Sequence, residues 1–217
     1  MSADLRMIGG GDIRKGSPAY RHVCLAMFLG GFSTFWLLYW PQPLLPHLAR
    51  DFGLTPAGSS VVLSAATAAM ALALIPASFL ADRYGRKPLM QLAMVLAALL
   101  TMLVLAAPDY GTLLMLRVLT GIVLAGMPAV AMAYLAEEIE AGALGSAMGI
   151  YVAGTALGGM GGRLCMALVA DVASWPVGAA VVGVTGLAAS LVFWRLLPDS
   201  RHFRPRPLPL SPAGRQA

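Results

Sequence analysis

The sequence has few charged residues and only two cysteines. Charged residues make up 12% of its 217 positions, whereas a soluble domain has about 25%. The cysteines, Cys24 and Cys165, lie far apart in apolar stretches, so the sequence offers neither a disulfide framework nor a cysteine-based metal site. The apolar stretches also lack Asp and Glu away from their ends, so they offer no acidic proton carrier of the usual membrane-embedded kind.

Apolar residues are abundant instead, at 59% of the chain with a mean hydropathy of +0.76. Six runs are long enough to cross a bilayer as helices. They cover about 22–46, 57–81, 88–107, 110–135, 144–169 and 174–197. We therefore predict an all-α membrane protein with a six-helix bundle over 22–197. It is flanked by an N-terminal tail over 1–21 and a disordered Pro- and Arg-rich tail over 198–217.

Lys and Arg residues are distributed unevenly between the two sides of the predicted bundle. Most lie in the two tails and in the connection after the second run, whereas Arg50 alone falls on the other side. Because cytoplasmic segments carry the excess of Lys and Arg, both termini are predicted to be cytoplasmic, in a bacterial-type inner membrane. The net charge of +5 then reflects topology, and we expect the lipid bilayer rather than nucleic acid as the partner.

A charged hexapeptide, DRYGRK, connects the second and third runs. Its notable residues are Asp82, Arg83, Gly85, Arg86 and Lys87. Gly85 suits the backbone conformation that stops a helix. The pattern resembles the signature loop of the major facilitator superfamily, Gly-x-x-x-Asp-Arg-x-Gly-Arg-Lys, with Ser78 in place of the leading glycine. The resemblance implies that the loop docks on an opposite half of a transporter and latches one conformation, with Asp82 making the key interaction.

Three polar residues are candidates for a cavity that binds substrate or a coupling ion. Arg117, in RVLTGIVLAG, matches the family's Arg-x-x-Gln-Gly motif, with Thr120 in place of Gln; an arginine within the membrane faces a cavity or partner, or extends to the interface. Arg163 has the same two alternatives. Gln42 belongs to QPLLPHLARDFGLT, which resembles the outer end of the first helix in drug and sugar (arabinose-type) efflux members.

Glycines predict where helices pack closely. The fifth run carries glycines at four- or five-residue spacing, which allows a neighbouring helix to approach. We assign this packing role to Gly121, Gly149, Gly154, Gly158 and Gly162. The fifth run also resembles the glycine-rich helix of the family's antiporters, although Gly159 stands where proline is expected. The similarity of FLADRYGRKP to LVADVASWP suggests a three-plus-three inverted repeat.

The resemblance covers one half of a fold that usually has two six-helix halves, and it implies the N-terminal half. It implies a secondary active transporter that exports a small molecule, such as a drug, sugar or metabolite, by alternating access, with no cofactor, metal or enzymatic activity. Three alternatives stay open: a truncated transporter, a half-size transporter that pairs with itself or another half, and a non-transporting protein that keeps the fold. If two copies pair, a cysteine introduced by Gly158→Cys is expected to form a cross-link between them.

Overall fold

The computed structural model describes residues 13–200, and it confirms an all-α architecture with six helical segments long and apolar enough to cross a membrane. The first segment runs from α1 (Pro18–Tyr39) through the short 3₁₀ helix η2 (Gln42–Leu44) to α2 (Leu45–Asp51). The second is α3 (Pro56–Tyr84), and the third is α4 (Arg86–Leu103) with η3 (Val104–Ala106). The fourth joins α5 (Tyr110–Leu124) to α6 (Pro128–Glu138), and α7 (Ala141–Val172) and α8 (Trp175–Leu196) are the last two.

Side-chain caps and prolines explain where several helices begin. Ser17 and Thr55 each accept a hydrogen bond from a backbone N–H in the first turn of α1 or α3, and proline follows each cap. Asp109 caps α5 in the same way, with its Oδ1 2.8 Å from the amide nitrogen of Thr112. The fourth segment is interrupted before Pro128, which begins α6.

The second helix extends further than the apolar run that predicted it. Because α3 continues to Tyr84, Asp82 and Arg83 lie in its last turn, and Gly85 alone separates α3 from α4. Gly85 has a φ of 102°, a conformation that residues with a Cβ rarely adopt. Residues 18–21 likewise belong to α1 rather than to a tail, and most of the predicted disordered tail lies outside the described residues.

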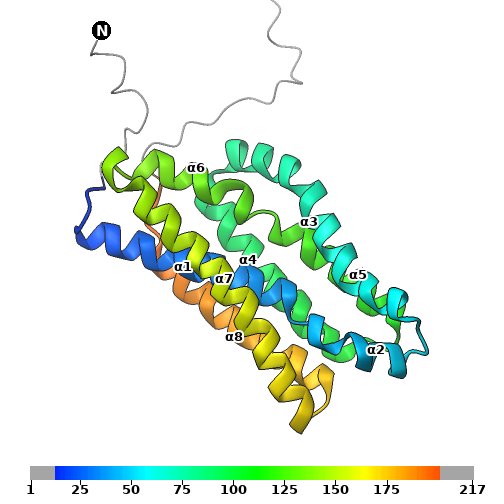
Figure 1. Cartoon of the computed structure of the whole chain (residues 1–217). Helices are drawn as coiled ribbons and strands as arrows, with labels where there is room; N and C mark the ends of the chain where they lie inside the picture. The colour runs from blue at the N-terminus through cyan, green and yellow to red at the C-terminus, as the bar shows by residue number, and fades with distance from the viewer. Residues whose placement is uncertain (1–12, 201–217) are drawn as a thin grey trace, which may run out of the picture.

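The helix pairing follows a three-plus-three arrangement (Figure 1). The most extensive contacts join α1 to α7, α3 to α5 and α4 to α8. In a three-plus-three repeat, α1 corresponds to α5, α3 to α7, and α4 to α8. Replacing each helix by its counterpart turns the α1–α7 pairing into the α5–α3 pairing and leaves the α4–α8 pairing unchanged. The next pairings, α1 with α8 and α4 with α5, are exchanged in the same way. The pairing therefore has the symmetry that the repeat predicts.

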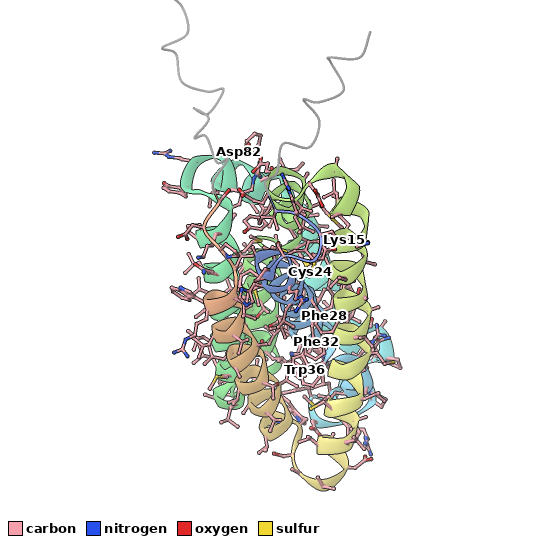
Figure 2. All side chains as sticks on the ribbon, turned by 90° about the vertical axis from the view of Figure 1, so that its left-hand side faces the viewer. Lys15, Cys24, Phe28, Phe32, Trp36 and Asp82 are labelled. Carbon is pink, nitrogen blue, oxygen red and sulfur yellow. The ribbon has the colours of Figure 1, made fainter. Side chains whose placement is uncertain are left out.

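Glycines allow the backbones of α1 and α7 to approach closely. A Cβ added at any of three α7 glycines would overlap a backbone carbonyl oxygen of α1. These glycines are Gly154 at Phe28, Gly158 at Phe32 and Gly162 at Trp36. Figure 2 labels the three aromatic residues, which follow one another along α1. Because the contacts are to backbone atoms, a larger side chain at any of these glycines would push the helices apart.

The other two predicted packing glycines differ from each other. A Cβ at Gly121 of α5 would overlap the carbonyl oxygen of Ala66 in α3, so close packing occurs there as well. Gly149 faces open space, with no atom within 4 Å of a Cβ built on it. The prediction of a packing role for Gly149 is therefore wrong for contacts among residues 13–200, because it lies on an exposed face of α7.

Burial is also uneven among the helices. The α3 helix is the least buried of the six segments, and its Leu72 and Ile75 side chains are 80% and 68% exposed. A contiguous apolar surface of this kind marks a contact with lipid or with another protein segment. The outer face of α3 is therefore available for such a contact.

Candidate functional site

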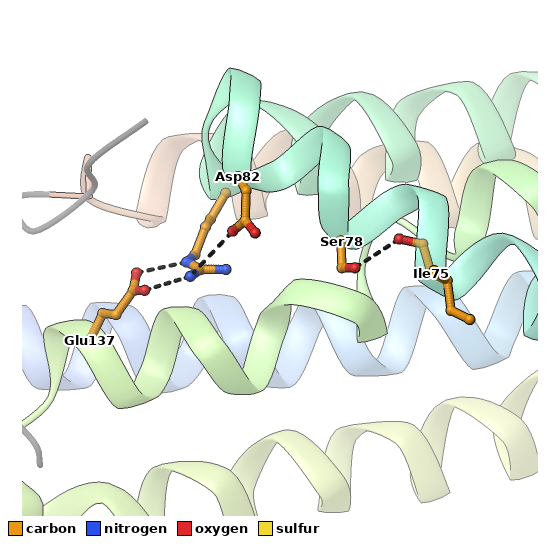
Figure 3. Close-up of polar contacts among 5 residues, drawn as sticks. Ile75, Ser78, Asp82 and Glu137 are labelled. Atoms are coloured by element: carbon orange, nitrogen blue, oxygen red, sulfur yellow. Dashed lines mark hydrogen bonds and ion pairs between the residues drawn. The ribbon is translucent and has the colours of Figure 1, made fainter. Parts of the chain in front are cut away.

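The signature-loop residues form an ion-pair cluster at one end of the bundle (Figure 3). Arg86, the first residue of α4, donates two hydrogen bonds to the carboxylate of Glu137 near the end of α6, with its Nε 2.6 Å from Oε2. A planar guanidinium matches a carboxylate in this two-bond arrangement. The Oδ1 of Asp82 lies 3.8 Å from Nη2 of Arg86, from the opposite side of the loop. The Arg86–Glu137 pair therefore links the α3–α4 loop to α6.

Arg86 and Asp82 differ in how strongly they are bound within this cluster. The Arg86 side chain is 14% exposed and is already committed to Glu137 through two bonds. Asp82 is 38% exposed and, within the described part of the chain, accepts no hydrogen bond in addition to its longer ion pair. Asp82 consequently has free lone pairs at the surface, whereas Arg86 is bound to Glu137 and holds α4 against α6.

The remaining two cations of the loop have different partners. Lys87 Nζ lies 2.8 Å from Oδ1 of Asp199, which is almost fully exposed. The hydrogen bond and positive charge of Lys87 lower the pKa of the Asp199 carboxyl from its ordinary value. Arg83 has no carboxylate within ion-pair distance in residues 13–200, and its guanidinium carbon lies 5.3 Å from the centre of the Tyr84 ring.

Segments near both ends of the described chain join this cluster. Ile13 forms a short parallel bridge with Ile139: its N–H donates to Glu138 O at 3.1 Å, and its carbonyl accepts from the N–H of Glu140 at 3.2 Å. On the C-terminal side, the hydroxyl of Ser200 donates to Glu138 Oε1 at 2.7 Å. Figure 2 places Lys15 and Asp82 at the same end of the molecule.

We call this region the charged end. It comprises residues 82–87 around the α3–α4 turn, residues 137–140 between the end of α6 and the start of α7, and the end segments 13–15 and 199–200. The acidic residues 137–140 contact each of the other three stretches. Sequence reasoning did not assign a site role to Glu137 or Glu138. The available signal was the sequence EEIE, which topology places on the same side as DRYGRK. Opposite charges on two connections of one side predict a contact between them.

Arg117 lies inside the bundle rather than on an open wall. Its side chain is fully buried, and it donates to the backbone oxygens of Leu37, at 3.0 Å, and Leu38. The usual helical donor for the Leu37 carbonyl would be the amide of residue 41, but Pro41 has no N–H. Arg117 therefore satisfies a carbonyl that proline leaves without a donor, and it fixes the end of α1.

Arg163 and Gln42 occupy more accessible positions. The guanidinium of Arg163 lies 4.7 Å from the centre of the Tyr39 ring, and that of Arg117 lies 5.4 Å from the centre of the Trp40 ring. The two arginines thus contact consecutive residues at the end of α1. Gln42 is exposed in η2, just beyond them. A cavity role for all three residues stays a prediction, and in this conformation Arg117 faces no open space.

Two further polar groups lie near this region without partners in the described residues. They are the indole nitrogen of Trp40 and the Nε of Arg117, both buried. Within residues 13–200, no three or more His, Cys, Asp or Glu side chains are grouped so that they could hold a metal ion. The end of α1 therefore offers hydrogen-bond donors and cations rather than metal ligands.

Comparison with known proteins gives consistent matches. Residues 27–216 match the family model described as Major Facilitator Superfamily. The chain is 43% identical over 202 residues to the MFS-type transporter YybF of Bacillus subtilis (strain 168), covering 93% of this chain and 50% of that protein. It is 44% identical over 196 residues to the inner membrane transport protein YnfM of Escherichia coli (strain K12), covering 90% of this chain and 47% of that protein.

A solved structure shows the same fold. It is a bacterial homologue of the human lysosomal transporter Spinster in an inward-facing, unoccupied conformation, with a TM-score of 0.73 and 20% identity. The match covers 92% of this chain and 48% of that one. The chain thus spans about half the length of the curated relatives it matches.

Proposed function

Because this chain belongs to the major facilitator superfamily, we propose that it acts as the N-terminal half of a secondary active transporter, together with a second six-helix half. In such transporters the substrate site lies between two halves that rock against each other. The six membrane-crossing segments and the match to half of each relative support this role. The membrane is the bacterial inner membrane, with both termini in the cytoplasm.

The observation that carries the proposal is the unequal engagement of Asp82 and Arg86. Arg86 is held by two bonds to Glu137, so the loop is fastened to its own half. Asp82, beside it, keeps a partly exposed carboxylate with free lone pairs. A loop held in this way leaves a partly exposed carboxylate, which is suited to dock on donors of a second half. Asp82 is then the latch residue, and Arg86 positions it.

The transported compound is a small molecule, and the direction is efflux. The resemblance of QPLLPHLARDFGLT to efflux members supports this direction. Gln42 and Arg163 supply exposed polar groups near the end of α1, which suits a polar or anionic compound. Arg117 holds the proline-broken end of α1 in place, so its substitution is expected to alter the cavity indirectly.

A reconstitution experiment tests this proposal. The purified chain is placed in liposomes loaded with labelled arabinose, alone or together with the C-terminal half of YnfM. Efflux is expected only with both halves, and Asp82→Asn is expected to reduce it, whereas Glu140→Gln, a matched loss of one acidic charge, leaves it unchanged. Efflux by the chain alone, at the rate of the two-half preparation, would contradict the need for a second half.

Self-pairing of two copies is tested by cross-linking, but not at Gly158. A cysteine there would overlap the Phe32 carbonyl and separate α1 from α7, so the probe expected from the sequence is unsuitable. Met160 is 51% exposed on the same helix and is a better position. In a Cys24→Ser, Cys165→Ser background, Met160→Cys is expected to form no cross-linked dimer in membranes. An efficient dimer would favour the self-paired half-transporter instead.

A further inference from the structure

An apolar groove lies between α3, α4 and α5 and is not used by the proposed transport mechanism. It has a volume of about 240 Å³ and is lined almost wholly by apolar side chains. Its α3 wall is formed by Ala73, Pro76, Ala77 and Leu80. The α4 and α5 walls contribute residues such as Leu92, Leu96 and Ile122, and Gly126 after α5 completes the lining.

Small residues explain why the three helices leave this space. Alanines at positions 73 and 77 carry only a methyl group, and Pro76 lies within α3, where it removes one helical hydrogen bond. The rim is not closed, because Leu80 and Leu92 are 46% and 55% exposed. The groove therefore opens outward from the bundle, toward the surroundings of the membrane-crossing helices.

About one helical turn beyond the α3 wall of the groove lies a cation that has no anionic partner among residues 13–200. Along α3, Ala73, Ala77 and Leu80 follow at three- or four-residue spacing, and the same spacing continues to Arg83 and Tyr84. Arg83 is thus about 4.5 Å further along the helix axis than Leu80, at 1.5 Å per residue. Arg83 has no carboxylate partner in residues 13–200, unlike the other two cations of the loop.

We propose that this groove holds one acyl chain of an anionic phospholipid, whose phosphate binds Arg83 beside the Tyr84 ring. The lipid comes from the leaflet at the α3–α4 end. An apolar groove open to the bilayer suits a hydrocarbon chain, and an exposed Arg–Tyr pair one turn further lies at the level of the headgroups. The charge of Arg83 selects a net negative lipid such as phosphatidylglycerol. The site uses residues of this half alone, so it does not depend on the transport proposal, although Arg83 belongs to the signature loop.

Native mass spectrometry of the delipidated chain in detergent, with phosphatidylglycerol or phosphatidylcholine added, tests this site. The wild-type chain is expected to retain one phosphatidylglycerol, about fivefold more strongly than phosphatidylcholine, which corresponds to one Lys or Arg contact at an anionic surface. Arg83→Gln is expected to reduce retention of phosphatidylglycerol to the level of phosphatidylcholine. Arg195→Gln, which removes another exposed cation in the last turn of α8, serves as the matched control and retains the wild-type preference.

A second pair of variants tests the groove itself. Ala77→Leu fills the groove and is expected to lower retention of both lipids, whereas Ala71→Leu, at an exposed α3 position outside the lining, has no effect. Equal retention of the two lipids by the wild-type chain would overturn the charge selection. Three outcomes would overturn the proposed lipid site. One is wild-type lipid retention by Ala77→Leu, and another is an equal loss of retention in Arg83→Gln and Arg195→Gln. The third is a lipid-free dimer in place of the lipid-bound monomer.

Discussion

The two ends of the bundle are held together by different chemistry. The charged end joins four stretches of chain through carboxylates, as in the Arg86–Glu137 and Lys87–Asp199 pairs. The opposite end, beside α2, is held by aromatic side chains: the Phe52 ring lies 5.7 Å from that of Tyr110 and 6.1 Å from that of Trp175. Contacts at the first end depend on ionisation and salt, whereas those at the second depend mainly on packing.

The end that is held by ion pairs is the one that can be rearranged. Ion pairs can exchange partners without exposing apolar surface, so we expect Asp82 to exchange its 3.8 Å pair with Arg86 for donors of a second half, while Glu137 continues to hold Arg86. The aromatic end has no such alternative, because separating Phe52 from Tyr110 exposes apolar rings to water. We therefore expect the partly exposed Asp82 of the charged end to act on pairing with a second half, and Glu137 and the aromatic end to act on the stability of this half.

The largest effect on stability is expected from Glu137→Gln at the charged end. The substitution removes the charge that pairs with Arg86, a side chain that is only 14% exposed, and costs about 2 kcal/mol. The loss is measured on heating in a Cys165→Ser background, as the temperature at which the buried Cys24 reacts with a thiol-specific dye. Glu140→Gln is the control, because Glu140 accepts from the backbone nitrogen of Lys15 and has no guanidinium partner in the described chain. Equal shifts in the two variants would contradict the special role of the Arg86 pair.

A smaller effect is expected from Trp175→Phe at the aromatic end. The indole Nε1 donates to Asp51 Oδ2 at 2.9 Å, and phenylalanine keeps an aromatic ring but loses this donor. The expected cost is about 1 kcal/mol. The same dye assay, run at low and high salt, checks the comparison between the ends. The Trp175→Phe shift is expected to change less with salt than the Glu137→Gln shift, and the reverse order would refute the assignment.

A pH-dependent effect is expected from the Lys87–Asp199 pair. Because Lys87 lowers the pKa of the Asp199 carboxyl, the pair stabilises the folded chain above the ordinary pKa of an aspartate. This stabilisation is lost as the pH falls through the lowered folded pKa. The thermal midpoints of the wild-type chain and of Asp199→Asn are therefore expected to differ slightly at pH 7 and to converge in acid. A difference that grows in acid would show that the sign is wrong.

Much of this fold was predictable from the sequence, because each membrane segment needs a long apolar run. Prolines and caps, such as Pro56 after Thr55, also placed several boundaries within a few residues. Apolar runs gave the wrong end for α3, because the polar residues of its last turn remain helical beyond the run. Gly149 meets no neighbour within residues 13–200, which the sequence could not reveal, because glycine spacing shows which residues are small but not which face of the helix meets another helix.

The candidate site was less predictable. The family motif identified Asp82 and Arg86, but the partner Glu137 lies 51 positions further along the chain, and only its side of the membrane was apparent. The location of Arg117 was predictable in part, because an arginine inside a membrane needs polar partners. That those partners are the Leu37 and Leu38 carbonyls is not apparent from the sequence near Arg117, because Pro41, which leaves the Leu37 carbonyl without a helical donor, lies in the turn after α1, far from Arg117 in the sequence.

The smallest effect on the isolated half is expected from Asp82→Asn. Its carboxylate is 38% exposed and 3.8 Å from Arg86, so the change in stability should be below about 0.5 kcal/mol. The dye assay on the purified chain checks this value. A loss as large as that of Glu137→Gln would mean that Asp82 serves the internal structure of this half instead of facing outward.

The same substitution tests the latch role of Asp82 when a second half is present. The measurement is co-purification of the tagged chain with the C-terminal half of YnfM from membranes, for the wild-type chain and for Asp82→Asn at equal levels of membrane insertion. If Asp82 is the latch, the wild-type chain retains the second half and Asp82→Asn loses most of it. Unchanged co-purification, or failure of Asp82→Asn to insert into the membrane, would contradict the latch.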